Sequence, residues 1–179
     1  MLRAPAQPLS DGVVWLRPLE DGDRDAALKT MRDPLVRHWL NMPAKPRAGD
    51  FDALLRTARH GASTGGRFDF VVCDRIGGEP VGSVVASRRH RENWEIAYMA
   101  YDAGRRRGLM TRAVRLVCGW LFAEGVGRIE VRTHPENAAS QRLAERVGFR
   151  REGVERKSIW LHGERADAVV WSLLPEDPR

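Results

Sequence analysis

The clearest pattern in the chain is an apolar stripe at helical spacing between residues 110 and 122. Apolar residues recur there every three or four positions, and arginines occupy positions between them. Because this spacing puts the apolar side chains on one face, the segment is predicted to be an amphipathic helix packed on a core. Glycines at 125 and 127 predict its end. The stripe consists of Met110, Ala113, Val114, Val117, Cys118, Leu121 and Phe122.

Three further segments have weaker helical patterns. Residues 21–40 begin with acidic residues and carry apolar residues at turn spacing, with an interruption at Pro34. Asp50 is expected to cap a second helix, which runs to about residue 60. Asn137 is expected to cap a short third helix that Gly148 ends.

Apolar runs, several of them alternating with polar residues, predict the strands. Residues 67–73, 81–87 and 94–101 follow one another closely, so they are predicted to form a meander. The pair Gly77-Gly78 is typical of a hairpin turn between the first two. Further strands are predicted at 13–17, at 128–133, from 149 onward and at 168–174.

The order of these elements predicts the fold class. A strand, two helices and three strands are followed by a helix, a strand, a helix and two strands. A central strand–helix–strand unit therefore lies between antiparallel strands, in one α/β domain over residues 12–175 with a mixed sheet and flanking helices. Residues 1–11 contain prolines and polar residues, and we expect them to form a flexible tail.

Composition narrows the class of protein. The chain has 179 residues, of which 42% are hydrophobic and 30% charged, so one folded domain is expected and a disordered chain is excluded. The chain has no run of about 18 apolar residues, so no membrane span is predicted. No secretory signal is visible, so a cytoplasmic location is expected. The five histidines and two cysteines lack the spacing of metal ligands, so no metal site is expected.

The charge balance is basic, with 30 Lys and Arg residues against 24 Asp and Glu residues and a net charge of +6. Only Lys29, Lys45 and Lys157 are lysines, so nearly all the cations are arginines. This excess can reflect a GC-rich genome, or it can serve to bind phosphate, which arginine does through two parallel hydrogen bonds. The balance favours an anionic partner, either a nucleic acid or a phosphorylated small molecule.

A candidate anion site lies at Arg105–Thr111, between a predicted strand and the clearest helix. The first turn of a helix presents free N–H groups at its positive dipole end, and Gly108 lets the backbone approach a ligand closely. The arginines add charged donors. A solvated basic turn that caps the helix explains the same residues equally well. The chain has neither a Walker loop nor a G-x-G-x-x-G motif, so the site is expected to hold a pyrophosphate without cleaving it.

Several blocks of the sequence resemble the GNAT superfamily of acetyl-CoA-dependent N-acetyltransferases. Within it, the chain is most similar to the branch that includes the ribosomal-protein N-terminal (alanine/serine) acetyltransferases. The family's phosphate-binding pattern matches Arg105 and Gly108, with Met110 in place of the usual small residue. The blocks lie in family order, and the remaining matches are Leu16–Leu19 with Asp21, Glu95–Tyr98, Asn137, Ser140, Glu145, Arg146, Gly148 and Phe149.

The resemblance implies a single-domain GNAT-like fold whose mostly antiparallel sheet has six to seven strands. It implies that the anion site cradles the pyrophosphate of acetyl-CoA, and that the pantetheine arm pairs with the preceding strand. A gap between residues 98–100 and 131–133 would admit the thioester. The cofactor-binding residues it implies are Met99, Ala100, Arg105, Arg106, Arg107, Gly108, Leu109, Met110, Thr111, Asn137 for the pantetheine, and Ser140 near the sulfur.

The reaction implied is direct transfer of an acetyl group to a primary amine. A backbone N–H near Met99 or Ala100 is expected to stabilise the oxyanion. Many members have a tyrosine proton donor seven residues after the asparagine, but this chain has Ala144 there. That role is therefore vacant, or it falls to Ser140 or to water. Glu95 is the best carboxylate candidate for the base, although a solvent-facing strand residue is its simpler interpretation, and water suffices for an α-amine with a pKa of about 8.

Two other classes of function stay open. Arg88, Arg89 and Arg91, with the anion site, would suit a protein that binds nucleic acid or the ribosome, but no nucleic-acid motif is present, so this partner is not favoured. A GNAT domain that binds CoA without activity is the other alternative. The acceptor stays open among a protein N-terminus, a polyamine, an amino sugar and an antibiotic amine. A homodimer is expected from the resemblance alone.

Overall fold

The structure is a computed structural model of the whole chain, and it describes residues 2–74, 78–90 and 93–178. Gly77 of the expected turn and Arg91 of the basic run lie outside these residues. The helices are α1 (Arg24–Met31), α2 (Pro34–Trp39), α3 (Ala48–Ser63), α4 (Leu109–Ala123) and α5 (Ala138–Val147), with short 3₁₀ turns η1 (Asp21–Asp23) and η2 (Asp102–Gly104). The strands are β1 (Leu9–Ser10), β2 (Val14–Pro18), β3 (Arg67–Asp74), β4 (Pro80–His90), β5 (Asn93–Ala100), β6 (Arg128–Thr133), β7 (Arg150–Leu161) and β8 (Glu164–Leu173).

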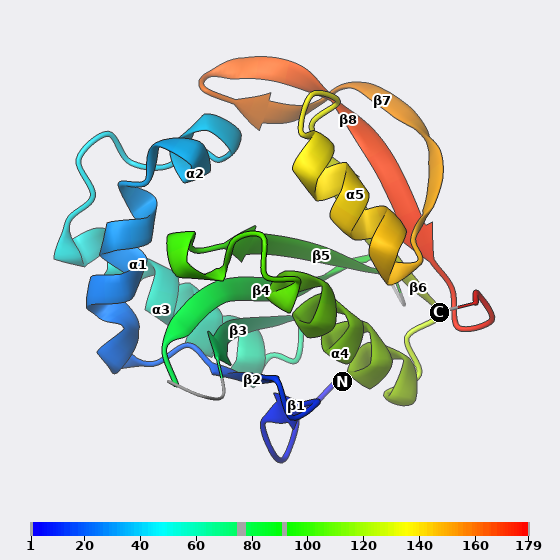
Figure 1. Cartoon of the computed structure of the whole chain (residues 1–179), viewed down its shortest axis with the longest axis horizontal. Coiled ribbons are helices and arrows are strands. Elements are labelled where there is room, and N and C mark those ends of the chain that lie inside the picture. The colour runs from blue at the N-terminus through cyan, green and yellow to red at the C-terminus, as the bar shows by residue number, and fades with distance from the viewer. Residues whose placement is uncertain (1, 75–77, 91–92, 179) are drawn as a thin grey trace.

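All the described strands belong to one sheet, in the order β1-β2-β3-β4-β5-β6-β8-β7 (Figure 1). β5 and β6 pair in parallel, and α4 connects them, as predicted for the central strand–helix–strand unit. The other neighbouring strands pair antiparallel. The predicted α/β fold with a mixed, mostly antiparallel sheet is therefore confirmed.

The sheet has eight strands within the described residues rather than six to seven, because part of the predicted tail is a strand. Leu9 pairs with Leu16 and Ser10 pairs with Trp15 in β2. Leu9 also packs against the core, together with Leu2. A strand of two residues is too short to show alternation in the sequence, so the tail prediction is wrong at this point.

Different helices cover the two faces of the sheet. α4 and α5 lie on the face nearer the viewer in Figure 1, and α3 lies behind the sheet. The predicted stripe of α4 is buried on the sheet, and Ala113, Val114 and Leu121 are among its fully buried members. On the opposite face, α1 and α3 form a smaller core through residues such as Met31 and Phe51.

Three predicted boundaries differ from the structure. Asp50 does not cap α3 but lies in its first turn, where its carboxylate accepts the N–H of the N-cap residue Arg47 (2.7 Å). Pro34 does not interrupt one helix but begins α2, after the N-cap Asp33. β8 begins at Glu164 rather than at residue 168, because its hairpin with β7 extends through polar residues beyond the core.

Candidate functional site

The parallel strands β5 and β6 separate part-way along their length. Their pairs are Asn93–Arg128, Trp94–Ile129 and Glu95–Glu130. No further pair forms in this described stretch, although β5 continues to Ala100 and β6 to Thr133. The strands therefore diverge where the gap between residues 98–100 and 131–133 was expected.

The register of β4 and β5 shows which backbone amides face this gap. The Tyr101 N–H donates to the Val81 carbonyl (3.0 Å), and in an antiparallel ladder the hydrogen-bonded pairs occur at every second residue. The N–H of Met99 is therefore directed toward β4, whereas those of Tyr98 and Ala100 are directed toward the gap. Of the two predicted oxyanion donors, the register favours Ala100 and disfavours Met99.

The loop after β5 leads to an uncapped helix N-terminus. Gly108 is the N-cap residue of α4, with a left-handed φ of +73°, and no side chain caps this end of the helix. The N–H groups of residues 109–111 have no partner in the preceding turn, as at any helix start. Gly108 is exposed, and a Cβ placed on it would meet no atom within 4 Å. We call Arg105–Gly108 and the first turn of α4 the corner, and its backbone at Gly108 is open to an anion.

The three arginines before Gly108 differ in their contacts. Arg105 forms an ion pair with Asp33, the N-cap residue of α2 (2.8 Å), and this guanidinium lowers the pKa of the Asp33 carboxyl. Arg107 pairs with Asp74 at the end of β3. Arg106 is exposed and has no ion pair with any residue that the structure describes. The side chains of Arg105 and Arg107 thus fix the loop, and that of Arg106 is exposed beside it.

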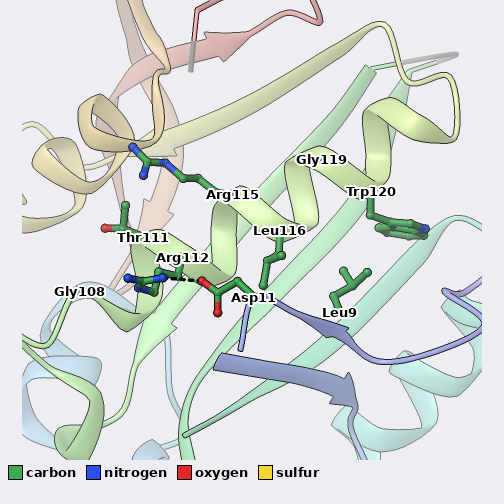
Figure 2. Close-up of a pocket in the computed structure, with 9 residues that line it drawn as sticks. All are labelled: Leu9, Asp11, Gly108, Thr111, Arg112, Arg115, Leu116, Gly119 and Trp120. Atoms are coloured by element: carbon green, nitrogen blue, oxygen red, sulfur yellow. Dashed lines mark hydrogen bonds and ion pairs between the residues drawn. The ribbon is translucent and has the colours of Figure 1, made fainter. Parts of the chain in front are cut away.

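A groove of about 700 Å³ runs from Gly108 along the outer side of α4. Figure 2 shows Arg112 and Arg115 at its Gly108 end, and Arg112 pairs there with Asp11 (2.7 Å). Leu9 and Trp120 lie toward the other end of the groove. It therefore combines cationic groups near the anion site with an apolar surface farther along the helix.

The start of α5 lies across the gap from β5. Asn137 is the N-cap residue of α5, and its side-chain oxygen accepts the Ser140 N–H (3.0 Å). The Ser140 hydroxyl donates to the Tyr98 hydroxyl (3.1 Å), which in turn donates to the Ser140 carbonyl (2.9 Å). The structure thus brings Asn137 and Ser140 together and adds Tyr98 to them.

Tyr98 was not among the site residues that the sequence predicted. Its segment was noted for the resemblance, but the partner of its hydroxyl lies 42 residues away, and no local spacing reveals such a contact. Burial raises the pKa of Tyr98 to about 12, so the hydroxyl stays protonated around neutral pH. Tyr98 is half-buried, and no sequence pattern marks it.

Glu95 lies at the closed end of the gap, in the last pair between β5 and β6. Its carboxylate is 3.1 Å from the Arg89 guanidinium and 3.5 Å from that of Arg132. Four residues, or about 13 Å of strand, separate it from Met99. Its role as a base therefore stays a prediction, and its carboxylate is already paired with two arginines.

Met110 departs from the family pattern, and Gly82 of β4 makes room for it. A Cβ added to Gly82 would overlap the Met110 sulfur and would lie 2.7 Å from the Met99 carbonyl oxygen. Met110 is 4% exposed, so its side chain fills the core under the corner. It therefore contributes packing below the anion site.

In the described ranges, no group of three or more His, Cys, Asp or Glu residues could hold a metal ion. No helix within them has the length and apolar character needed to cross a membrane.

Comparisons with known proteins agree with this geometry. Residues 14–150 match the family model described as an acetyltransferase (GNAT) domain. The Bacillus subtilis (strain 168) protein named "Probable N-acetyltransferase YjcK" is 39% identical over 83 residues, which is 46% of this chain and 46% of that protein. This match spans less than half the length of the relative.

Two solved structures share the fold. The ribosomal-protein-S5-alanine acetyltransferase from Vibrio fischeri has a TM-score of 0.81 at 21% identity, over 96% of this chain and 98% of that chain. RimL, described as a ribosomal L7/L12 alpha-N-protein acetyltransferase and solved with coenzyme A, has a TM-score of 0.85 at 14% identity, over 94% of this chain and 98% of that chain. At these identities the likeness concerns the fold alone.

Proposed function

The chain belongs to the acetyltransferase (GNAT) family, and from this premise we propose that it transfers the acetyl group of acetyl-CoA directly to a primary amine. The acceptor is the α-amine of a protein N-terminus or the amine of a small molecule. One observation supports this above all: β5 and β6 diverge beside an uncapped helix N-terminus. Acetyl-CoA fits this arrangement, because its diphosphate would lie at the helix N-terminus and its thioester in the gap.

Acetyl-CoA lies along β5 and ends at the corner of α4. The N–H groups of residues 109–111, at the positive end of the helix dipole, hold the pyrophosphate, and Arg106 adds a charged donor. The pantetheine arm runs along the gap-facing edge of β5. The side-chain NH₂ of Asn137 remains available to this arm, because its oxygen caps α5. The groove along α4 offers room for the nucleotide end.

The reaction is one acyl transfer. The neutral amine attacks the thioester carbonyl carbon, so that a C–N bond forms and the carbonyl oxygen becomes an oxyanion, which the Ala100 N–H stabilises. The C–S bond then breaks, CoA leaves as the thiolate, and the amine proton passes to water. An oxyanion donor of this kind supplies about 3–4 kcal/mol in other acyl transfers.

The leaving thiolate needs stabilisation more than a strong acid, since a thiol has a reference pKa of about 8.5. Ser140 is the hydroxyl nearest to this role, and Tyr98 holds it in place. Tyr98, whose pKa is about 12, is too weak an acid to protonate the thiolate itself. We therefore assign Ser140 as a hydrogen-bond donor to the sulfur, which it becomes when Tyr98 donates to the Ser140 hydroxyl oxygen instead of to the Ser140 carbonyl, and Tyr98 as the residue that positions it.

A dedicated base is not required for an α-amine. At pH 7 roughly a tenth of such amines, with a pKa of about 7.7–8.0, is already neutral, so water can accept the proton. A lysine amine, with a pKa of about 10.4, would need a placed base. The Glu95 carboxylate is paired with two arginines, so it is poorly suited to accept that proton. The difference between the two amine pKa values therefore favours an acceptor amine of low pKa.

Release of the CoA thiol, measured with a panel of amines and N-terminal peptides, tests the proposal. We expect release that depends on both acetyl-CoA and an amine, together with an acetylated acceptor in the mass spectrum. Binding of acetyl-CoA without transfer to any amine would instead show an inactive CoA-binding domain. Binding of RNA with no effect of CoA would show the nucleic-acid alternative.

A further inference from the structure

The short helix α2 contacts the loops that follow both of the diverging strands. At its start, the N-cap residue Asp33 forms the ion pair with Arg105, which follows β5 through the turn η2. At its end, the ring centre of Trp39 lies 5.4 Å from that of His134, which directly follows β6. The loop after β5 and the loop after β6 are therefore held at opposite ends of one helix.

The contact at the start of α2 is largely shielded from water. Nη2 of Arg105 lies 2.8 Å from a carboxylate oxygen of Asp33, and the two side chains are 22% and 17% exposed. This nitrogen is buried, and the geometry is that of an ion pair rather than of a hydrogen bond. The same oxygen accepts the N–H groups of Leu35 and Val36 (2.9 and 3.1 Å), so one carboxylate both caps α2 and attracts the loop after β5. Partial burial reduces screening by water, which strengthens this attraction.

The contact at the end of α2 is tied to the start of α5. The Asn137 N–H donates to the His134 carbonyl (2.9 Å), and the Gln141 side chain donates to the Pro135 carbonyl (2.6 Å). His134 is therefore fixed relative to the cap of α5, on the far side of the gap from β5.

The β7–β8 hairpin holds the end of α2 from another side. Nε2 of His162 lies 3.0 Å from the His38 carbonyl oxygen. In the loop after α2, the Asn41 side-chain NH₂ donates to the Trp160 carbonyl, and its oxygen accepts the His162 N–H, both at 2.7 Å. α2 is thus fixed at both ends, and it cannot follow one loop without breaking its contacts with the other segments.

An open gap between neighbouring strands needs such a support. The ladder of β5 and β6 stops at Glu95–Glu130, although both strands continue. Further pairing would bring the strands to about 4.8 Å apart and would satisfy the backbone N–H and C=O groups that face the gap. α2 has six residues, or about 9 Å of helix axis, so loops held at its two ends stay farther apart than paired strands.

We propose that α2 is a spacer that holds the gap open, with Asp33 and Trp39 as positioning residues for acetyl-CoA. This inference rests on the proposed function. The two residues act through Arg105 and His134 on the width of the gap, and not by contact with the cofactor. The thioester arm then enters a gap that is already open, so that no binding energy is used to separate the strands.

Two variants weaken the spacer, one at each end. Asp33→Asn keeps an oxygen to cap α2 but removes the charge that attracts Arg105. Trp39→Leu keeps an apolar residue of good helix propensity but removes the ring beside His134. In each variant fewer molecules should hold the open gap, so the Kd of acetyl-CoA should rise by about threefold or more. Because both variants weaken one spacer, the double variant should bind scarcely more weakly than the weaker of the two single variants.

A fragment of the cofactor separates an effect on the gap from an effect on the corner. Adenosine 3′-phosphate 5′-diphosphate, the nucleotide end of CoA, can reach the corner but has no arm to enter the gap, so its Kd should be unchanged in both variants. Asp102→Asn is the matched control. It removes the other carboxylate beside Arg105, which is 83% exposed and does not belong to α2, and it should change neither Kd. Isothermal titration gives these values, and the Tm of each variant checks its fold.

Three results would count against the inference in different ways. An unchanged Kd of acetyl-CoA in both variants would overturn it. A parallel rise for acetyl-CoA and the nucleotide fragment would also overturn it, because Asp33 and Trp39 would then act on the corner. An unmodified protein that does not bind acetyl-CoA would instead contradict the proposed function, and this inference with it.

Discussion

The hydroxyl of Tyr98 on β5 lies 3.1 Å from the hydroxyl of Ser140 on α5, across the gap where β5 and β6 diverge. A second bond from Tyr98 to the Ser140 carbonyl fixes the first turn of α5 against the strand. The family's usual tyrosine is absent from α5, where this chain has Ala144. A tyrosine from the opposite side of the gap thus lies beside the serine proposed to face the sulfur.

Removing the Tyr98 hydroxyl should slow the chemical step more than it weakens binding. We expect Tyr98→Phe to lower kcat by about tenfold with little change in either KM, because Ser140 would lose its orientation while the ring keeps its packing. Steady-state kinetics with acetyl-CoA and one good amine measure the split.

A double-mutant cycle checks that the two hydroxyls act together. Ser140→Ala should resemble Tyr98→Phe, and the double variant should be scarcely slower than either single one, because both remove one interaction. Full additivity of the two effects would show that Tyr98 does not act through Ser140.

The two tyrosines of the chain, Tyr98 and Tyr101, should ionise only at strongly alkaline pH. Burial raises the pKa of each to about 12, whereas the value in an unfolded chain is about 10. Folding therefore favours the protonated forms, and their contribution to stability is complete below pH 10 and is lost as the pH rises from about 10 to about 12.

Ultraviolet absorption of tyrosinate measures this directly. The native protein should show the band only near pH 12, and the denatured chain should show it near pH 10 as the internal control. A native midpoint at pH 10 would mean that these hydroxyls are accessible to water.

The sequence predicted those parts of the fold whose pattern is long. The stripe of α4 repeats over more than three turns, so both its existence and its buried face were correct. β1 was missed, because two residues show no period and their pairing with β2 is decided by the hairpin around Asp11. The start of α3 was misplaced because Asp50 bonds backward to Arg47, and an acid in either position gives the same sequence signal.

In the candidate site, too, the sequence predicted the local features and missed the long-range contacts. The corner at Gly108 and the cap at Asn137 are local, since each depends on one helix start, and the sequence predicted both. The contacts that position them are not local: Arg105 reaches Asp33 at the start of α2, and Tyr98 reaches Ser140. Such pairs depend on how the helices pack on the sheet, which no short pattern encodes.

Asn137 has two roles, and two substitutions separate them. Asn137→Asp keeps an oxygen to cap α5 but removes the NH₂ proposed to face the pantetheine. It should keep the Tm and raise the KM for acetyl-CoA more than that for the acceptor. Asn137→Ala should do the same and also lose about 1 kcal/mol of stability with the cap. Equal effects on both KM values would argue against the pantetheine contact.

Gly82 and Met110 should be coupled in stability. Gly82→Ala should lower the free energy of unfolding by roughly 1–3 kcal/mol, because its methyl group would overlap the Met110 side chain. Met110→Ala should cost about 2–5 kcal/mol through the cavity it leaves, and the double variant should cost less than the sum. Gly119→Ala, where a Cβ meets nothing within 4 Å, is the matched control and should not destabilise. Denaturant unfolding gives all four values.

The binding of acetyl-CoA to two variants of Gly108 tests the central claim most directly. Asp and Asn both tolerate the left-handed conformation and have nearly the same shape, and the site has open space for either. Only Asp places a negative charge against the pyrophosphate. Isothermal titration should therefore give a Kd for Gly108→Asp at least about tenfold above that for Gly108→Asn. The same Kd in both variants would contradict a diphosphate held at this corner.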